Sequence, residues 1–268
     1  MYQKAIVTFL DILGFGDFVK DNDDKVVGKI LDAVERSTVP NTEMATLYQP
    51  EVITFSDSIV RIRKVESDEN LAYPIGLLFQ ELLDLVRAQG ELIDNNVLIR
   101  GSVTFGEIFI SDGRVFGPAL IEAYELESKF AKYPRIIVDP QLIQEYKTNK
   151  LLKAIHHSIE QEIEYVGDLL KQGDDGMWFI DYARAIEEEL DEPEMYPIFL
   201  QRHREVILSG SKKHKKLNSV LSKYVWIANY HNQIVSKIED DWFERNKLDK
   251  NDLLISSDEI PALQYVQP

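Results

Sequence analysis

The order of predicted strands and helices is the feature that most constrains how this chain folds. Runs of apolar and β-branched residues at 5–10 and 52–55 predict β-strands, and the apolar spacing in 25–36 predicts a helix between them. The 52–55 strand continues through a turn of small residues into a second strand, which makes a hairpin. A strong amphipathic helix lies within 73–89, and 96–110 has the composition of a strand. The predicted order is therefore strand, helix, strand, strand, helix, strand.

This order is that of the split βαβ, or ferredoxin-like, unit. We therefore predict an α+β fold with a ferredoxin-like βαββαβ core, an antiparallel-rich sheet and helices packed on one face. In such a sheet the first strand and the hairpin are neighbours at the centre. A short strand beginning at Gly113, a helix at 119–130 and a strand at 135–138 extend this core.

The pattern changes beyond residue 150. The segment IEYV predicts a short strand, and two long helices are predicted at 198–208 and 212–238, after an acidic linker that contains two prolines. We expect one domain at 1–150 and a mostly helical C-terminal extension at 151–268. The extension is expected to pack on the core or on a second copy of the chain.

Composition restricts the class of protein. Of the 268 residues, 44% are hydrophobic and 28% charged, as in ordinary soluble globular proteins. No apolar stretch approaches the roughly 20 residues of a membrane helix, and the N-terminal apolar run is too short and too acidic for a signal peptide. The absence of cysteine excludes disulfides and thiolate zinc sites. We therefore expect a cytoplasmic protein with no membrane partner.

The net charge of −16 restricts the partners further. A surface this acidic repels polyanions, so we expect no nucleic-acid partner. A small anionic ligand remains possible where metal ions neutralise it locally. The dense basic run at 211–224 is expected to be a solvated helix face, as most charge runs are.

Two isolated aspartates suggest where such a ligand would bind. Asp11 and Asp57 each follow a short apolar run and lie next to small residues. A carboxylate at the end of a buried strand is costly unless its charge is compensated. The predicted topology brings both together, and hard divalent cations prefer oxygen ligands of this kind. The pair therefore suits two-metal phosphoryl chemistry, although either aspartate alone is also a common helix or turn cap.

Three segments resemble the catalytic core of class III nucleotidyl cyclases in order and spacing. They are FLDILGF, ITFSDSIV and RGSVTFGEIFISDGRVFGPALIEAYELES, and the resemblance covers roughly residues 4–130. Ser56-Asp57 stands where the family has Gly-Asp. Phe116-Gly117 is similar to the Trp-Gly turn that precedes the family's catalytic helix.

The resemblance implies a definite reaction. Two Mg²⁺ or Mn²⁺ ions would be held at Asp11, Ile12 and Asp57; one would help activate the ribose 3′-hydroxyl, and the other would bind the β- and γ-phosphates. Attack on the α-phosphorus would expel pyrophosphate and give a 3′,5′-cyclic nucleotide. The implied catalytic residues are Asp11, Asp57 and Arg100. The candidates for binding the nucleotide are Ile12, Leu13, Gly14, Phe15 and Ser56. A homodimer is expected, with each site completed by the partner subunit.

The departures from the family concern base selection and the transition state. Ile53 and Pro118 stand where the family has its purine-selecting lysine and aspartate. Ile121 and Glu125 stand where it has its catalytic asparagine and arginine. An ordinary adenylyl or guanylyl cyclase is therefore not expected. The candidates for a replacement cation are Arg61, Arg63, Arg100, Lys129 and Lys132.

Two interpretations follow. FGPALIEAYELE, DDGMWFIDY and KYVWIANYHN resemble the bacterial pyrimidine cyclases of Pycsar anti-phage systems, which implies UTP, slightly favoured over CTP, as substrate and a separate effector that responds to the product. Tyr48 and Thr54 would then be candidates for lining a base pocket. The alternative is a catalytically silent nucleotide-binding or scaffold module that uses its C-terminal helices for association.

Overall fold

The computed structural model carries no ligand and divides into two compact units. The residues that it describes are 1–38, 48–111, 113–214 and 218–265. The first unit comprises 1–92 and 98–182, and the second comprises 93–97 and 183–268. We describe each unit by itself.

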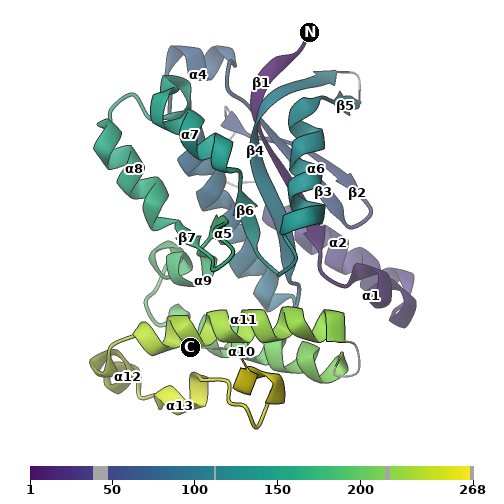
Figure 1. Ribbon diagram of the computed structural model, residues 1–268, viewed down its shortest axis with the longest axis vertical. Helices are drawn as coiled ribbons and strands as arrows, with labels where there is room; N and C mark the ends of the chain where they lie inside the picture. Colours follow the sequence, from purple (N-terminus) through teal and green to yellow (C-terminus); the bar gives the residue numbers. More distant parts are fainter. Residues whose placement is uncertain (39–47, 112, 215–217, 266–268) are drawn as a thin grey trace. The chain divides into compact units, whose positions relative to one another are not determined.

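The first unit is built on a sheet of eight strands in the order β2-β3-β1-β4-β6-β8-β7, with β5 paired to β4 (Figure 1). Strand β1 is antiparallel to both β3 and β4, and β4 is parallel to β6. The order β2-β3-β1-β4 confirms the predicted ferredoxin-like core. The strands are β1 (Gln3–Ile12), β2 (Glu51–Phe55), β3 (Ser58–Lys64), β4 (Ile99–Ser111), β5 (Arg114–Phe116), β6 (Ile136–Val138), β7 (Leu170–Gln172) and β8 (Trp178–Ile180).

Most of the helices predicted from apolar spacing are present in the structure. Those that begin in the first unit are α1 (Phe15–Asp21), α2 (Asp24–Thr38), α4 (Asp68–Ala72), α5 (Leu77–Asp94), α6 (Pro118–Phe130), α7 (Pro140–Thr148), α8 (Ile159–Asp168) and α9 (Tyr182–Ala185). The predicted strand IEYV is wrong, because it lies inside α8. Ser158 and Gln161 form a capping box that starts this helix, and Glu162 and Val166, four residues apart, are buried on its inner face.

Helices cover both faces of the sheet. Alternate residues of β1 point to opposite sides, so Val7 packs with Ala119 and Ala123 of α6, whereas Thr8 donates a hydrogen bond to Glu81 of α5. Figure 1 shows α6 in front of the sheet and α5 behind it. The one-faced arrangement expected from the split βαβ order is therefore wrong for the whole sheet, since α6 covers the second face. Among the described helices, none has the length and apolar character needed to cross a membrane.

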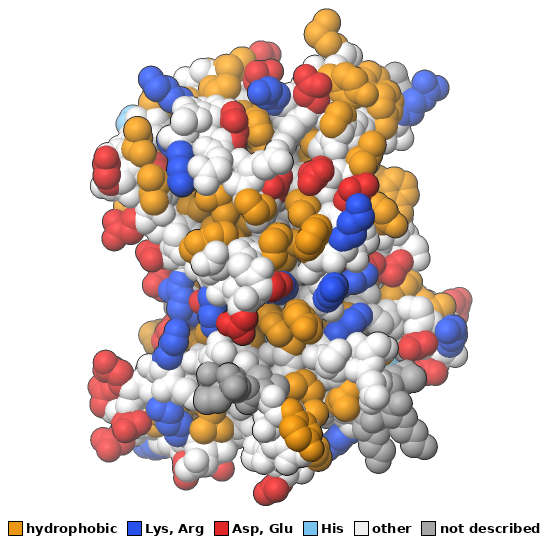
Figure 2. Space-filling view, viewed as in Figure 1, with side chains coloured by type: hydrophobic (Ala, Val, Ile, Leu, Met, Phe, Trp, Pro, Cys, Tyr) orange, Lys and Arg blue, Asp and Glu red, His pale blue; other side chains and the backbone are white. Residues whose placement is uncertain are grey.

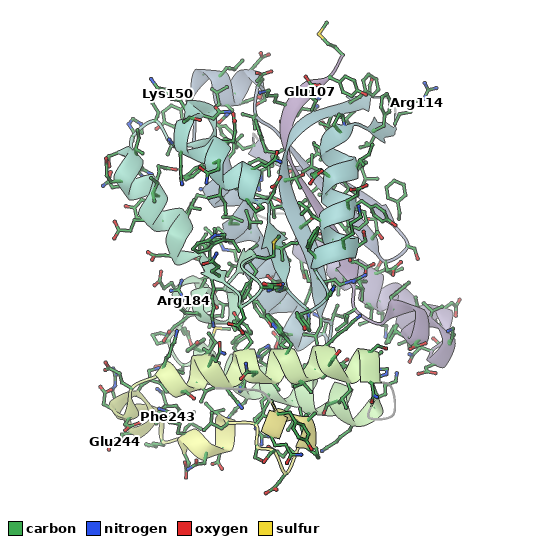
Figure 3. All side chains as sticks on the ribbon, in the orientation of Figure 1. Glu107, Arg114, Lys150, Arg184, Phe243 and Glu244 are labelled. Carbon is green, nitrogen blue, oxygen red and sulfur yellow. The ribbon has the colours of Figure 1, made fainter. Side chains whose placement is uncertain are left out.

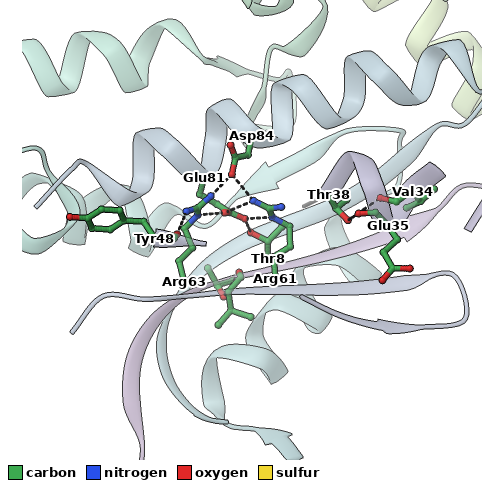
Figure 4. A network of polar contacts seen from close by, with 11 residues as sticks. Thr8, Val34, Glu35, Thr38, Tyr48, Arg61, Arg63, Glu81 and Asp84 are labelled. Atoms are coloured by element: carbon green, nitrogen blue, oxygen red, sulfur yellow. Dashed lines mark hydrogen bonds and ion pairs between the residues drawn. The ribbon is translucent and has the colours of Figure 1, made fainter. Parts of the chain in front are cut away.

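A buried network of charges joins β3 to α5 (Figure 4). Arg61 Nε donates to Glu81 Oε1 at 2.8 Å, and Arg63 Nε donates to Glu81 Oε2 at 2.6 Å. Both arginines also contact Asp84, and the Arg61 and Glu81 side chains are each 1% exposed. Burial opposes ionisation of Glu81, but attraction by Arg61 and Arg63 is stronger and holds its pKa well below the ordinary value. The two positive and two negative groups neutralise one another inside the fold.

The predicted boundary near residue 150 differs from the boundary between the compact units. Strand β8 pairs with β6, and β7 pairs with β8, so the sheet of the first unit continues to Ile180. A functional division into 1–150 and 151–268 stays a prediction.

The second unit is helical. It contains α10 (Met195–Lys213), α11 (Asn218–Lys237), α12 (Asp240–Asn246) and α13 (Lys250–Leu253). The long helix predicted at 212–238 is wrong at its start, because α10 continues to Lys213 and α11 begins at Asn218. Two fully buried histidines lie between α10 and α11: His203 Nδ1 is 3.0 Å from His231 Nδ1, and His231 Nε2 is 2.9 Å from the Leu253 carbonyl. His231 must donate from Nε2 to the carbonyl, so in the neutral pair its Nδ1 accepts from His203.

This histidine pair predicts a loss of stability in mild acid. Burial lowers the pKa of His203 well below 6.5 and that of His231 to about 4. The unfolded chain takes up protons on both rings below about pH 6.5, whereas the folded chain does not. The free energy of unfolding should therefore fall as the pH drops from 6.5 toward 4, by up to about 1.4 kcal/mol per pH unit for each histidine.

Urea unfolding at pH 7 and pH 5, followed by tryptophan fluorescence, measures this effect. His231→Gln removes one titrating ring, so its loss between the two pH values should be smaller than that of the wild type. An equal loss in both proteins would show that the pair does not cause it.

Candidate active site

The topology brings Asp11 and Asp57 to one end of the sheet. Asp11 lies near the end of β1, paired with Ser58 on one side and Arg100 on the other. Asp57 is the second residue of the two-residue turn between β2 and β3. The Ile12 N–H donates to the Asp57 carbonyl at 3.3 Å, which ties the turn to β1. The Asp11 and Asp57 carboxylates are close enough for the charge of Asp57 to raise the pKa of Asp11.

The surroundings of Asp11 disfavour its ionised form. Burial raises its pKa above 3.8, Arg100 opposes this shift, and the Asp57 carboxylate adds to it. Its side chain is 18% exposed, so water screens the repulsion incompletely. A cation shared by the two carboxylates would relieve both effects.

The donor set fits Mg²⁺ or Mn²⁺ held jointly with a phosphate ligand. Mg²⁺ is usually bound by one or two carboxylates plus substrate phosphates, rather than by a cage made only of protein atoms. In the described ranges no group of three or more His, Cys, Asp or Glu side chains is placed to hold a metal. Asp11 and Asp57 supply the two carboxylates, and Ile12 as a third ligand stays a prediction.

Two backbone N–H groups of the predicted phosphate-binding segment are already used in hydrogen bonds within the fold. The Ile12 N–H is used by Asp57, and the Leu13 N–H donates to the Leu98 carbonyl at 2.8 Å. These two groups are therefore not free to bind a phosphate, contrary to what the sequence predicts. Gly14 has a positive φ of 77° and precedes α1, which begins at Phe15. The N–H groups of Gly14 and Phe15 stay candidates.

Ser56 occupies a backbone conformation that favours glycine. Its φ is 56°, in the left-handed region. Serine thus occupies a turn position at which, as noted from the sequence, the family that this segment resembles has glycine. A contact between Ser56 and a nucleotide stays a prediction.

Arg100 is the predicted cation that lies beside Asp11; its catalytic role stays a prediction. Its Nε donates to Asp11 Oδ2 at 3.0 Å and lies 2.8 Å from Glu127 Oε1. Its Nη1 donates to the Ala131 carbonyl at 3.4 Å. The neighbouring Gly101 permits close strand packing, because a Cβ there would lie 2.4 Å from the Phe9 carbonyl oxygen.

The other predicted cations lie elsewhere. Arg61 and Arg63 point to the α5 face and are neutralised there, so they are wrong as candidates. Lys129 forms the surface ion pair with Glu125 that its i,i+4 spacing favours, at 2.7 Å. Lys132 is exposed. Two further charged residues lie far from Arg100. They are Glu107 on β4 and Arg114 on β5, toward the other end of β4 (Figure 3).

Glu127 is the residue of the site that the sequence analysis missed. Its side chain is 3% exposed, on the face of α6 that packs on the sheet. A signal was present: Glu127 follows Ala119 and Ala123 at intervals of four residues, which is the spacing of one helix face. A carboxylate in that row has to face the interior and needs a counter-charge.

The positions that depart from the cyclase pattern lie on or beside α6. Ile53 of β2 is half-buried against the apolar cluster under this helix, and Pro118 is the first residue of the helix. Ile121 is 62% exposed and Tyr124 56% exposed. Figure 2 shows hydrophobic side chains gathered beside α6 on this face.

Of the two candidates for a base pocket, Tyr48 is not brought together with the aspartates. The Tyr48 hydroxyl donates to the Tyr73 carbonyl at 3.0 Å, and Tyr48 lines a pocket of about 180 Å³ at the open end of the hairpin. That end lies opposite the turn that carries Asp57, and the volume is below the range of about 300–1,000 Å³ typical of ligand pockets. Thr54 is exposed on β2.

Comparison with known proteins gave structural similarity without sequence similarity. No protein-family model and no curated protein matches the chain. The catalytic core of a rhodopsin–guanylyl cyclase with converted specificity, in complex with ATPαS, has 14% identity and a TM-score of 0.42, over 67% of this chain and 95% of that chain. A bacterial light-regulated adenylyl cyclase has 12% identity and a TM-score of 0.40, over 62% of this chain and 57% of that chain.

A class III adenylyl cyclase-like ATP-binding protein from Pseudomonas aeruginosa has 13% identity and a TM-score of 0.34, over 62% of this chain and 40% of that chain. At these identities and scores, the similarity does not assign the chain to a family.

Proposed function

We propose that this protein is a nucleotidyl cyclase that converts a pyrimidine ribonucleoside triphosphate to its 3′,5′-cyclic monophosphate and pyrophosphate. One observation carries the proposal: Asp11 and the turn that carries Asp57 meet at one end of a ferredoxin-like sheet, where burial and repulsion by the Asp57 carboxylate raise the pKa of Asp11. A pair of carboxylates held at such a cost is expected at a functional site.

The residues of the site have distinct roles in this reaction. Asp11 and Asp57 would hold Mg²⁺ or Mn²⁺, which when bound supplies positive charge for the phosphates and for the ribose 3′-oxygen. The N–H groups of Gly14 and Phe15 would orient the phosphates. Arg100 would supply positive charge near the α-phosphate, where charge redistributes as pyrophosphate leaves. Displacement at phosphorus depends mainly on such positioning and neutralisation, so no covalent nucleophile is required.

The choice of a pyrimidine rests on the lost purine contacts. Ile53 and Pro118 carry no side-chain donor or acceptor for a base edge, so a purine would lose the hydrogen bonds that select it. UTP is slightly favoured over CTP through the resemblance to Pycsar cyclases. A role in anti-phage signalling through a separate effector, a homodimer and a cytoplasmic location belong to the same proposal.

Incubation of the purified protein with UTP or CTP and Mn²⁺ tests the proposal. We expect a cyclic monophosphate and an equal amount of pyrophosphate. Binding of nucleotide with no product at high enzyme concentration would favour the silent module instead.

A further inference from the structure

Arg100 lies between two carboxylates that come from different elements. Its Nε is 3.0 Å from Asp11 Oδ2 on β1 and 2.8 Å from Glu127 Oε1 on α6. The guanidinium Nε carries one hydrogen, which it donates to Asp11 Oδ2, whereas the buried Glu127 Oε1 accepts no hydrogen bond in the described structure. This N–H can serve only one of the two carboxylates, and Glu127 Oε1 is a second acceptor within reach of the same atom.

The two carboxylates that contact Arg100 differ in how deeply they are buried. Glu127 is 3% exposed, whereas the Asp11 side chain is 18% exposed. Arg100 also donates to the Ala131 carbonyl, immediately beyond the last residue of α6. The C-terminal end of a helix carries partial negative charge, which favours a cation there. The end of α6 thus holds Arg100 through groups that do not depend on Asp11.

We propose that Arg100 is a tethered cation that exchanges with the divalent ion at Asp11. Without metal it neutralises Asp11; when metal binds, it releases Asp11 and stays with Glu127 and the Ala131 carbonyl. Glu127 is thus a positioning residue, which acts by holding Arg100 beside the site. This inference rests on the metal pair of the proposed function.

The exchange avoids two electrostatic costs. Separating a buried carboxylate from a charged partner is strongly destabilising. Arg100 therefore has to remain close to Glu127 both with and without the metal ion. A guanidinium expelled from Asp11 with no second anion would repel the arriving metal ion. With Glu127 as second partner, the guanidinium keeps a counter-charge while Asp11 becomes available.

Nucleotide-free titration with Mn²⁺, followed by the electron paramagnetic resonance of the free ion, tests the exchange. Glu127→Gln keeps the size of the side chain but removes its charge, so Arg100 should stay on Asp11 and the Mn²⁺ affinity should fall about tenfold. Glu125→Gln is the matched control, because it removes the same charge on the same helix from a side chain that is 47% exposed and paired with Lys129. Its affinity should stay within about twofold of the wild type.

A second variant tests whether Glu127 acts through Arg100. Arg100→Met combined with Glu127→Gln removes the competing cation and leaves no unpaired buried charge, so Mn²⁺ should bind at least as tightly as to the wild type. Affinity as weak as that of Glu127→Gln alone would overturn the exchange. If Glu127→Gln does not fold, as judged by circular dichroism, Glu127→Asp retains the charge but retracts it, and Mn²⁺ should then bind more weakly than to the wild type.

The outcomes separate the two proposals. Wild-type binding that Asp57→Asn abolishes supports the metal pair, and an unchanged affinity in Glu127→Gln would then overturn the exchange alone. Absence of nucleotide-free Mn²⁺ binding by the wild type would overturn the exchange, which requires the ion to reach Asp11 in the protein alone, whereas a cyclic product in the assay with triphosphate would still support the metal pair.

Discussion

Asp57→Asn should abolish formation of the cyclic nucleotide, with kcat lowered by at least about 10³-fold, while the protein remains folded. Asparagine keeps the shape of the turn residue but supplies no negative charge for a divalent cation. A bound metal ion contributes several kcal/mol to a phosphoryl transition state, and each 1.36 kcal/mol corresponds to about a tenfold change in rate. Initial rates with Mn²⁺ and a saturating triphosphate measure the loss.

The same substitution should not destabilise the metal-free protein. Asp57 contributes to the raised pKa of Asp11, so its removal relieves a repulsion. Thermal unfolding without metal should therefore give a Tm equal to or above that of the wild type. Asp17→Asn is the matched control, since its side chain is 47% exposed and paired with Lys20 in the same helix. Equal activity in wild type and Asp57→Asn would contradict the proposed role.

Glu81→Gln should cause the largest loss of stability, about 3–5 kcal/mol in the free energy of unfolding. The Glu81 carboxylate accepts from Thr8, Arg61 and Arg63 inside the core. Removing its charge leaves two buried guanidinium groups with Asp84 as the remaining carboxylate of the network. Urea denaturation at pH 7 measures the change.

The stabilisation by Glu81 also has a defined pH dependence. Its pKa is lowered in the folded state, so its contribution is complete above the ordinary value of 4.5 and is lost as the pH falls below it. Glu122→Gln, at an exposed position of α6, is the control and should change stability by less than about 0.5 kcal/mol. A loss below about 1 kcal/mol in Glu81→Gln would show that the network is not a stabilising unit.

The parts of the fold that the sequence predicted are those with a local signal. Runs of apolar and β-branched residues identified β1 and the hairpin, helical patterns identified the helices, and their order was sufficient for the antiparallel core. The segment IEYV failed because its apolar residues fit a strand as well as a helix. The capping box at Ser158 decides for the helix, and the sequence analysis did not use it.

The burial of charged side chains could not be predicted from local sequence patterns. Arg61 and Arg63 were expected to be candidate cations because they lie on the hairpin that carries Asp57. Their partner Glu81 lies on α5, and Thr8, which also binds Glu81, is 73 residues away from it in the chain. Only the folded topology brings these groups together.

In the candidate site, too, some features could be predicted from the sequence and others depend on the folded topology. The convergence of Asp11 and Asp57 was predicted from strand order. The use of the Ile12 and Leu13 N–H groups by the sheet depends on hydrogen-bond register, which the sequence does not specify. Glu127 had a visible helical spacing, but its partner Arg100 becomes apparent only when α6 lies across β4.

One measurement tests the central claim most directly. The protein is incubated with Mn²⁺ and an equimolar mixture of ATP, GTP, CTP and UTP, and the products are identified by mass spectrometry, with Asp57→Asn in parallel. We predict a cyclic pyrimidine monophosphate, mainly cyclic UMP, with an equal amount of pyrophosphate and no product from the variant. Mainly cyclic AMP or cyclic GMP would contradict the pyrimidine assignment, and no cyclic product from a wild-type protein that binds Mn²⁺ would contradict the cyclase itself.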